Sequence, residues 1–191
     1  MWLARFSPVP SGFPSHLQSD LQNMTSPTRV LFVCLGNICR SPAAEAVFAH
    51  LVAEAGVADR FVLDSAGTGA WHVGERADAR MRAAAERRGI PMTSRARQVT
   101  REDFETFDHV FAMDASNFAA LRRLAPAEHV DKLRLFRDFD PAGVGADVPD
   151  PYYGDSADFD EVLDIVTRAG RQLLAELNRD RAQPQEGAEP K

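Results

Sequence analysis

The chain has 191 residues, 45% hydrophobic and 26% charged, which suits one globular domain with a buried core. A net charge of −6 disfavours binding to nucleic acid or to anionic membranes, because both need a basic surface. No apolar run is long enough to cross a membrane, the N-terminus lacks the apolar core of a secretory signal, and two cysteines in one short turn make no disulfide scaffold. We therefore expect a cytoplasmic protein without nucleic-acid or membrane partners.

The two ends of the chain differ in composition from its middle. Residues 1–26 are rich in Ser, Pro and Gln and have no periodicity, which predicts a disordered N-terminal extension. Met24 lies just before the first predicted strand, which makes it a candidate for the true start site. Residues 180–191 resemble a flexible tail, which leaves residues 27–179 as the folded domain.

Between these ends, short apolar runs alternate with helical patterns. The apolar runs predict strands at residues 30–33, 61–64, 109–112 and 132–135. The patterns that follow them predict helices at residues 42–55, 77–88, 115–124 and 159–178, and Gly56 and Gly89 are placed to end the first two. This alternation predicts a single α/β domain of three layers: a parallel sheet with helices on both faces. Ligands of such folds bind at the carboxyl ends of the strands.

The first predicted strand ends in an unusual turn, with the sequence Cys34-Leu35-Gly36-Asn37-Ile38-Cys39-Arg40-Ser41. A strand, a tight turn and a helix in this order aim backbone N–H groups and a helix N-terminus at one point, where an anion such as phosphate can bind. Gly36 and Asn37 tolerate the positive φ angles that such a turn demands. Pro42 suits the first helical position, and Ser41 before it can cap the helix.

The same turn combines a thiol with a guanidinium. The helix N-terminus, the N–H groups and Arg40 favour the thiolate form of Cys34, which is a strong nucleophile, while Arg40 can hold two phosphoryl oxygens in a planar fork. The spacing Cys-x5-Arg arises often by chance, so the alternative is a buried structural cysteine beside an unrelated arginine. The preceding strand, the Gly-Asn pair and the Ser-Pro helix start favour attack on phosphorus.

The segment 33–42 closely resembles the low-molecular-weight protein tyrosine phosphatases. The resemblance extends from about residue 29 to about residue 179 and includes the segments 65–68, 71–74, 112–117 and 150–154, with 71–74 closer to bacterial members. It implies a four-stranded parallel sheet flanked by helices. It also implies hydrolysis of phosphomonoesters through a cysteinyl-phosphate, without a metal or other cofactor.

The resemblance assigns the catalytic roles. It makes Cys34 the nucleophile, Arg40 the phosphate clamp and Asp150, in Asp-Pro-Tyr-Tyr-Gly, the general acid. From the residues alone this pentapeptide is just a turn. Asp147 and Asp155 are nearby carboxylates, but neither precedes the Pro-Tyr-Tyr sequence.

Other residues receive supporting roles from the resemblance. Ser41 would donate a hydrogen bond to the Cys34 sulfur, and Cys39 would form a reversible disulfide with Cys34. Substrate and phosphate would contact Leu35, Gly36, Asn37, Ile38, Cys39, Ser41, Trp71, Tyr152 and Tyr153. The supporting network would comprise Ser65 and His72, which hold Asn37, and Asp114, which orders the site. Simpler alternatives are a small apolar filler for Cys39, a surface packing role for Trp71 and an exposed loop histidine for His72.

The leading function is a protein tyrosine phosphatase that acts on phosphotyrosine proteins and small aryl phosphates. Arsenate reductase chemistry on this fold needs further cysteines that the chain lacks, and a phosphotyrosine-binding module without turnover would not need all three of Cys34, Arg40 and Asp150. A phosphatase of small aryl or sugar phosphates is a further alternative. We expect a partner tyrosine kinase, and a monomer or weak homodimer.

Overall fold

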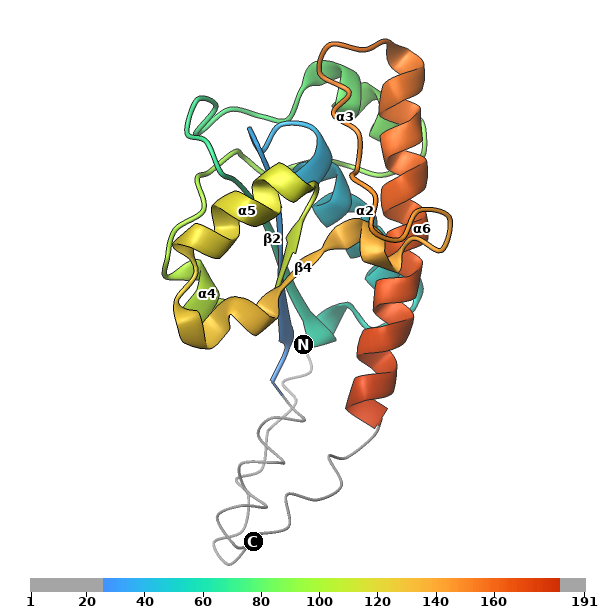
Figure 1. Cartoon of the computed structure of the whole chain (residues 1–191). Helices are drawn as coiled ribbons and strands as arrows, with labels where there is room; N and C mark the ends of the chain where they lie inside the picture. Colours follow the sequence, from blue (N-terminus) through green and yellow to red (C-terminus); the bar gives the residue numbers. More distant parts are fainter. Residues whose placement is uncertain (1–25, 183–191) are drawn as a thin grey trace, which may run out of the picture.

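A four-stranded parallel sheet forms the centre of the computed structural model, which describes residues 26–182 (Figure 1). Its strand order is β2-β1-β3-β4, and the strands are β1 (Thr28–Cys34), β2 (Phe61–Gly67), β3 (His109–Ala112) and β4 (Leu133–Leu135). The predicted α/β sheet is therefore confirmed. The predicted N-terminal extension, apart from Ser26, and residues 183–191 of the predicted tail lie outside the described residues.

Helices cover both faces of the sheet (Figure 1). One face carries α2 (Arg40–Glu54) and α6 (Ser156–Ala182), with α3 (Ala79–Glu86) packed on α6. The other face carries α4 (Asp103–Thr106) and α5 (Ala115–Leu124). Three short 3₁₀ turns lie in the connections: η1 (Ala58–Arg60), η2 (Ala127–Lys132) and η3 (Phe136–Phe139).

Strand β1 shows why the sheet has two apolar faces. Its side chains alternate in direction, so Val30, Phe32 and Cys34 belong to the core under α2 and α6. Leu31 and Val33 belong to the core under α4 and α5. All five are buried, as expected for a central parallel strand covered on both sides.

Phenylalanines fill the larger core. The Phe32 ring lies 5.1 Å from the ring of Phe136 in an edge-to-face arrangement, and 5.9 Å from the rings of Phe48 and Phe111. Edge-to-face and tilted contacts at these separations suit the charge distribution of aromatic rings. The cluster joins β1, β3, α2 and η3, so it fixes the strand that ends in Cys34.

Three details differ from the sequence predictions. Helix α2 begins at Arg40, so Ser41 lies within it and makes no capping hydrogen bond, and Pro42 is the third helical residue. A proline is tolerated there because N–H groups of the first turn have no partner within the helix. Helix α6 continues past residue 178, since no Gly or Pro stops it and Arg179 and Arg181 suit the negative end of the helix dipole. The single turn α4 was not predicted.

The strand order places a binding site at one edge of the sheet. The chain leaves β1 towards β2 and then returns to β3 on the other side of β1, so the carboxyl ends of β1 and β3 flank a crevice. Cys34 ends β1, and Asp114 follows β3 closely. Within residues 26–182, no helix has the length and apolar character needed to span a membrane.

Replacing Phe32 by alanine should lower the free energy of unfolding by about 3–5 kcal/mol, the usual cost of emptying a buried aromatic site. Urea denaturation followed by circular dichroism measures the change. Val144→Ala, at a position that is 71% exposed, is the control and should change it by less than about 0.5 kcal/mol. Equal losses in the two variants would contradict the assignment of this core.

Candidate functional site

Two donors of the Cys34 loop (residues 34–40) converge on the sulfur of Cys34. The backbone N–H of Asn37 lies 3.3 Å from the sulfur, and the hydroxyl of Ser41 lies 3.1 Å from it. The Ser41 hydroxyl also lies 3.2 Å from the carbonyl of Ala66, so one proton serves two acceptors. Because α2 begins at Arg40, its N-terminus faces the same region and stabilises negative charge there.

Asn37 has a left-handed backbone conformation, with φ of 55°, and is the only non-glycine residue between 26 and 182 with positive φ. Its side chain holds this conformation from three sides. The amide nitrogen donates to the hydroxyls of Ser41 and Ser65, both at 2.9 Å, and the amide oxygen accepts from the N–H of Arg97 at 2.9 Å. This sharp bend is what returns the loop over the sulfur.

The network below Asn37 ends at a buried carboxyl group. Ser65 donates to Glu45 Oε2 at 2.6 Å, and burial raises the pKa of Glu45 above its ordinary value, against opposing hydrogen bonds from Ser65 and Ser94. His72 is not part of this network. Its Nδ1 lies 2.8 Å from Glu75 Oε2, an acceptor three residues away in the same loop, so its predicted role in holding Asn37 is wrong.

Arg40 is buried between two carboxylates. Its Nη1 donates to Asp114 Oδ2 at 2.6 Å and to the carbonyl of Val148 at 3.2 Å, and its Nη2 donates to Asp150 Oδ2 at 2.8 Å. Burial opposes the charge, but Cys34, Asp150 and Asp114 outweigh it and raise the pKa of Arg40. Asp114 also caps α5 by accepting from the N–H of Asn117, so it fixes the guanidinium relative to the sheet.

Among the three carboxylates considered as general acid, Asp150 is the one that contacts the Cys34 loop. Its side chain is 46% exposed, and Oδ1 accepts from the N–H of Tyr152 at 3.2 Å while Oδ2 contacts Arg40. The other two candidate carboxylates are occupied elsewhere. Asp147 accepts from the N–H of Ala115, and Asp155 accepts from the N–H of Ala157 at the start of α6.

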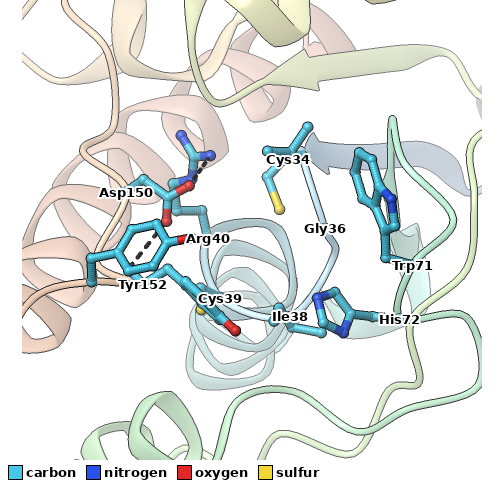
Figure 2. Close-up of a pocket in the computed structure, with 11 residues that line it drawn as sticks. Cys34, Gly36, Ile38, Cys39, Arg40, Trp71, His72, Asp150 and Tyr152 are labelled. Atoms are coloured by element: carbon cyan, nitrogen blue, oxygen red, sulfur yellow. Dashed lines mark hydrogen bonds and ion pairs between the residues drawn. The ribbon is translucent and has the colours of Figure 1, made fainter.

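These groups line one cavity of about 280 Å³ (Figure 2). The Cys34 sulfur points into it, with Arg40 and Asp150 on one side and Trp71 on the other. Its lining comprises Cys34, Leu35, Gly36, Ile38, Cys39, Arg40, Trp71, His72, Asp150, Tyr152 and Tyr153. Of the predicted substrate and phosphate contacts, only Asn37 and Ser41 do not line it. Both are buried, and they bond to the Cys34 sulfur and to the network around the Asn37 side chain.

Within residues 26–182, no group of three His, Cys, Asp or Glu side chains could hold a metal.

Aromatic rings form the outer walls of the cavity. The indole of Trp71 lies over Gly69, where an added Cβ would sit only 1.8 Å from the ring, so Gly69 permits this position. Tyr152 is 38% exposed, and its ring packs edge-to-face with that of Tyr153 at 5.0 Å. Tyr153 itself is 97% exposed and contributes only to the rim.

The two thiols of the loop differ in environment. Both are free and buried. Burial first, and then the negative charges of Asp78 and Cys34, raise the pKa of Cys39 far above its ordinary value. Cys39 is therefore a neutral thiol at physiological pH.

Comparisons with known proteins identify the family of this chain. The family model described as "Low molecular weight phosphotyrosine protein phosphatase" matches residues 29–183. The chain belongs to this family. A low molecular weight protein-tyrosine-phosphatase of Streptomyces coelicolor is 51% identical over 150 residues, which cover 77% of this chain and 92% of the relative.

Relatives of known structure extend to distant organisms. A protein tyrosine phosphatase from Entamoeba histolytica, solved with Hepes in its active site, is 40% identical with a TM-score of 0.78, and the match covers 81% of this chain and 99% of the relative. YfkJ from Bacillus subtilis is also 40% identical, with a TM-score of 0.76 and coverage of 81% and 97%. The fold and the family are thus the same across these chains.

Four residues that support the site were not among the residues predicted from the sequence. Glu45 and Arg97 hold the Asn37 network from below, and Asp78 and Arg80 connect the two sides of the cavity. Only Asp78 could have been recognised from the sequence, because an aspartate at the start of a predicted helix is a typical N-cap. The other three looked like ordinary polar residues of helices and loops.

Glu45→Gln should change how stability depends on pH. Because the folded chain raises the pKa of Glu45, it binds this proton more tightly than the unfolded chain does. The stability that protonated Glu45 contributes is therefore lost as the pH rises from the pKa of this group in the unfolded chain through its pKa in the folded chain. A glutamine at this position does not titrate and loses nothing over this range. Relative to wild type, the variant should gain free energy of unfolding as pH increases above about 4.5.

Urea denaturation at several pH values between 4.5 and 8 measures this difference. Glu86→Gln, on the exposed surface of α3, is the matched control for the loss of one carboxylate. A difference between Glu45→Gln and wild type that stays constant over this range would contradict the argument.

Proposed function

We propose that this phosphatase hydrolyses phosphotyrosine with Cys34 as nucleophile, Arg40 as phosphate clamp and Asp150 as general acid. The observation that carries the proposal is that the sulfur, the guanidinium and the carboxylate all line one cavity at the N-terminus of α2. An oxyanion in that cavity can meet the loop N–H groups and Arg40 while its phosphorus faces the sulfur.

In the first step, the Cys34 sulfur attacks phosphorus on the side opposite the leaving oxygen. The S–P bond forms as the P–O bond to the phenol breaks, and protonated Asp150 gives its proton to the phenol oxygen. Arg40 and the N–H groups stabilise the charge that spreads over the three remaining phosphoryl oxygens. Ser41 donates to the sulfur and stabilises it as a thiolate.

Substrate binding changes the partners of Arg40. In the structure, Nη2 of Arg40 is bonded to Asp150. Two phosphoryl oxygens would compete with Asp150 for the guanidinium of Arg40. Released from the ion pair, Asp150 would take up a proton from solvent and face the leaving oxygen. Asp114 keeps its own contact with Nη1 and holds the guanidinium in place.

In the second step, Asp150 acts as a base. Its carboxylate takes a proton from water, the water oxygen attacks phosphorus, and the S–P bond breaks to return the thiolate. Inorganic phosphate leaves, and Asp150 is again protonated for the next cycle.

The walls support aryl phosphates as substrates. Ile38, Trp71 and Tyr152 flank the mouth of the cavity and offer apolar surface to an aromatic ring. The ring length of phosphotyrosine places its phosphorus deeper than phosphoserine can reach. Small aryl phosphates fit the same description, whereas sugar phosphates would leave these walls without an apolar partner.

The other candidate functions have weaker support. Arsenate reduction needs further cysteines to transfer a disulfide, and the chain has only Cys34 and Cys39. A binding module without turnover would not need a carboxylate beside the clamp. The relatives described above are named as phosphatases.

Cellular context follows from the thiol chemistry. A nucleophilic thiol needs a reducing compartment, which supports a cytoplasmic location. Phosphotyrosine proteins produced by a partner tyrosine kinase would be the substrates. We also propose that Cys39 forms a reversible disulfide with Cys34 under oxidants. The chain is proposed to be a monomer or a weak homodimer.

Cys34→Ser should abolish turnover, and Asp150→Ala should slow it according to the leaving group. Loss of a general acid costs roughly 10²–10⁴-fold on phenyl phosphate, whose phenolate leaves poorly without a proton. The loss should be much smaller on p-nitrophenyl phosphate, whose leaving group needs less protonation. Steady-state kinetics of both substrates measure the two ratios.

Asp147→Ala is the matched control, because this nearby carboxylate bonds to the N–H of Ala115 instead of Arg40. It should reduce turnover of both substrates by the same factor. Equal losses in Asp150→Ala for good and poor leaving groups would reject Asp150 as the proton donor.

A further inference from the structure

Arg80, in the first turn of α3, lies where three elements meet. Its guanidinium donates to Asp78 through Nε at 3.1 Å and Nη2 at 2.8 Å, and Nη2 also donates to the carbonyl of Tyr152 at 3.0 Å. Its central carbon lies 4.7 Å from the ring centre of Phe159 on α6 and 5.7 Å from that of Tyr152. Arg80 therefore contacts the Asp150 loop (residues 150–154) through both the main chain and the ring of Tyr152.

Asp78 connects Arg80 to the Cys34 loop. The N–H of Asp78 donates to the carbonyl of Ile38 at 2.8 Å, and its carboxylate caps α3 by accepting from the N–H of Arg80 at 2.7 Å. The Asp78 side chain is only 13% exposed. Its hydrogen bonds with Arg80 lower the pKa of Asp78 and raise that of Arg80, so both groups stay charged. A continuous chain of contacts thus runs from Ile38 through Asp78 and Arg80 to Tyr152.

Two side chains from elsewhere bond to the Asp150 loop within residues 26–182. Arg40 bonds to Asp150, and Arg80 bonds to Tyr152. The other hydrogen bonds of the loop are internal, from Tyr152 N–H to Asp150 and from Gly154 N–H to the carbonyl of Pro151. Upstream, the chain is next held at Val148, whose N–H donates to the carbonyl of Met113.

The two contacts differ in what happens when substrate binds. The bond from Arg40 to Asp150 uses Nη2, a nitrogen that a bound phosphoryl group would also use, so we expect this bond to yield. The bond from Arg80 to Tyr152 lies outside the phosphate position and has no competitor there. It then holds the loop at a point two residues from the proton donor.

We propose that Arg80 is a positioning residue that keeps Asp150 over the leaving oxygen while Arg40 is occupied by phosphate. The proposal rests on the function assigned to Asp150 above. It predicts that Arg80 matters for transfer of the proton to the leaving group and little for phosphate binding. Arg80 thereby favours substrates with poor, unactivated phenol leaving groups, such as phosphotyrosine.

The test is Arg80→Met, which retains much of the apolar stem and removes the donors. On phenyl phosphate, kcat should fall roughly tenfold with KM nearly unchanged, a loss comparable to one partly exposed charge-assisted hydrogen bond. On p-nitrophenyl phosphate the change should stay within about twofold, because that leaving group needs little protonation. Thermal unfolding of the variant checks that the chain is folded.

Two further variants refine the test. Arg87→Met is the matched control, because Arg87 is an exposed arginine following α3 that pairs with Asp160 on α6 and does not contact the Asp150 loop. It should leave both substrates unaffected. Asp78→Asn retains an N-cap oxygen but weakens the hold on Arg80, so it should produce a smaller loss with the same preference for phenyl phosphate.

A double-mutant cycle decides whether Arg80 acts through Asp150. In the Asp150→Ala background, Arg80→Met should cause no further loss on phenyl phosphate, because the proton donor is already missing. Equal losses on both substrates in Arg80→Met, or the same loss with and without Asp150, would overturn the proposal. The proposed function itself fails separately, if the wild-type chain does not hydrolyse phosphotyrosine or if Cys34→Ser retains turnover.

Discussion

The left-handed conformation of Asn37 is the constraint on which the site depends. A residue with φ of 55° is unfavourable outside glycine, and asparagine tolerates it better than most. Here Ser41, Ser65 and Arg97 N–H hold the side chain, so groups of the chain itself stabilise the bend. The same bend directs the N–H of Asn37 at the Cys34 sulfur, and with Ser41 it gives the thiolate two donors. The proposed anion site is therefore built from hydrogen bonds within the chain.

In the proposed mechanism, the two aspartates that pair with Arg40 have different tasks. Asp114 is a helix cap with little exposure, and it fixes the guanidinium to the end of β3. Asp150 is half-exposed and lies on a loop, so its bond to the same guanidinium can be exchanged for one to phosphate. A rigid partner and an exchangeable one on the two terminal nitrogens let Arg40 stay in place while the acid changes partners. Loops held by a rigid sheet commonly carry such roles.

Local features were predictable from the sequence, and contacts between distant segments were not. The strand that ends in Cys34 and the turn before α2 follow from neighbouring residues, so apolar patterning and turn chemistry predicted them. Asp150 reaches Arg40 only through the fold, and the family resemblance supplied that prediction. Glu45 had no sequence signal, because its inward position depends on how α2 lies against Ser65 of β2. His72 was assigned wrongly for a similar reason, since Glu75 offers it a closer partner.

The most direct test is a crystal structure of the protein with vanadate, which imitates the phosphorus in the transition state. We expect vanadium within covalent reach of the Cys34 sulfur and two vanadate oxygens bound to the guanidinium of Arg40. It also predicts that Asp150 leaves Arg40 and faces the apical oxygen, while Asp114 keeps its contact. A vanadate bound away from the sulfur, or an Asp150 still paired with Arg40 beside the bound ion, would contradict it.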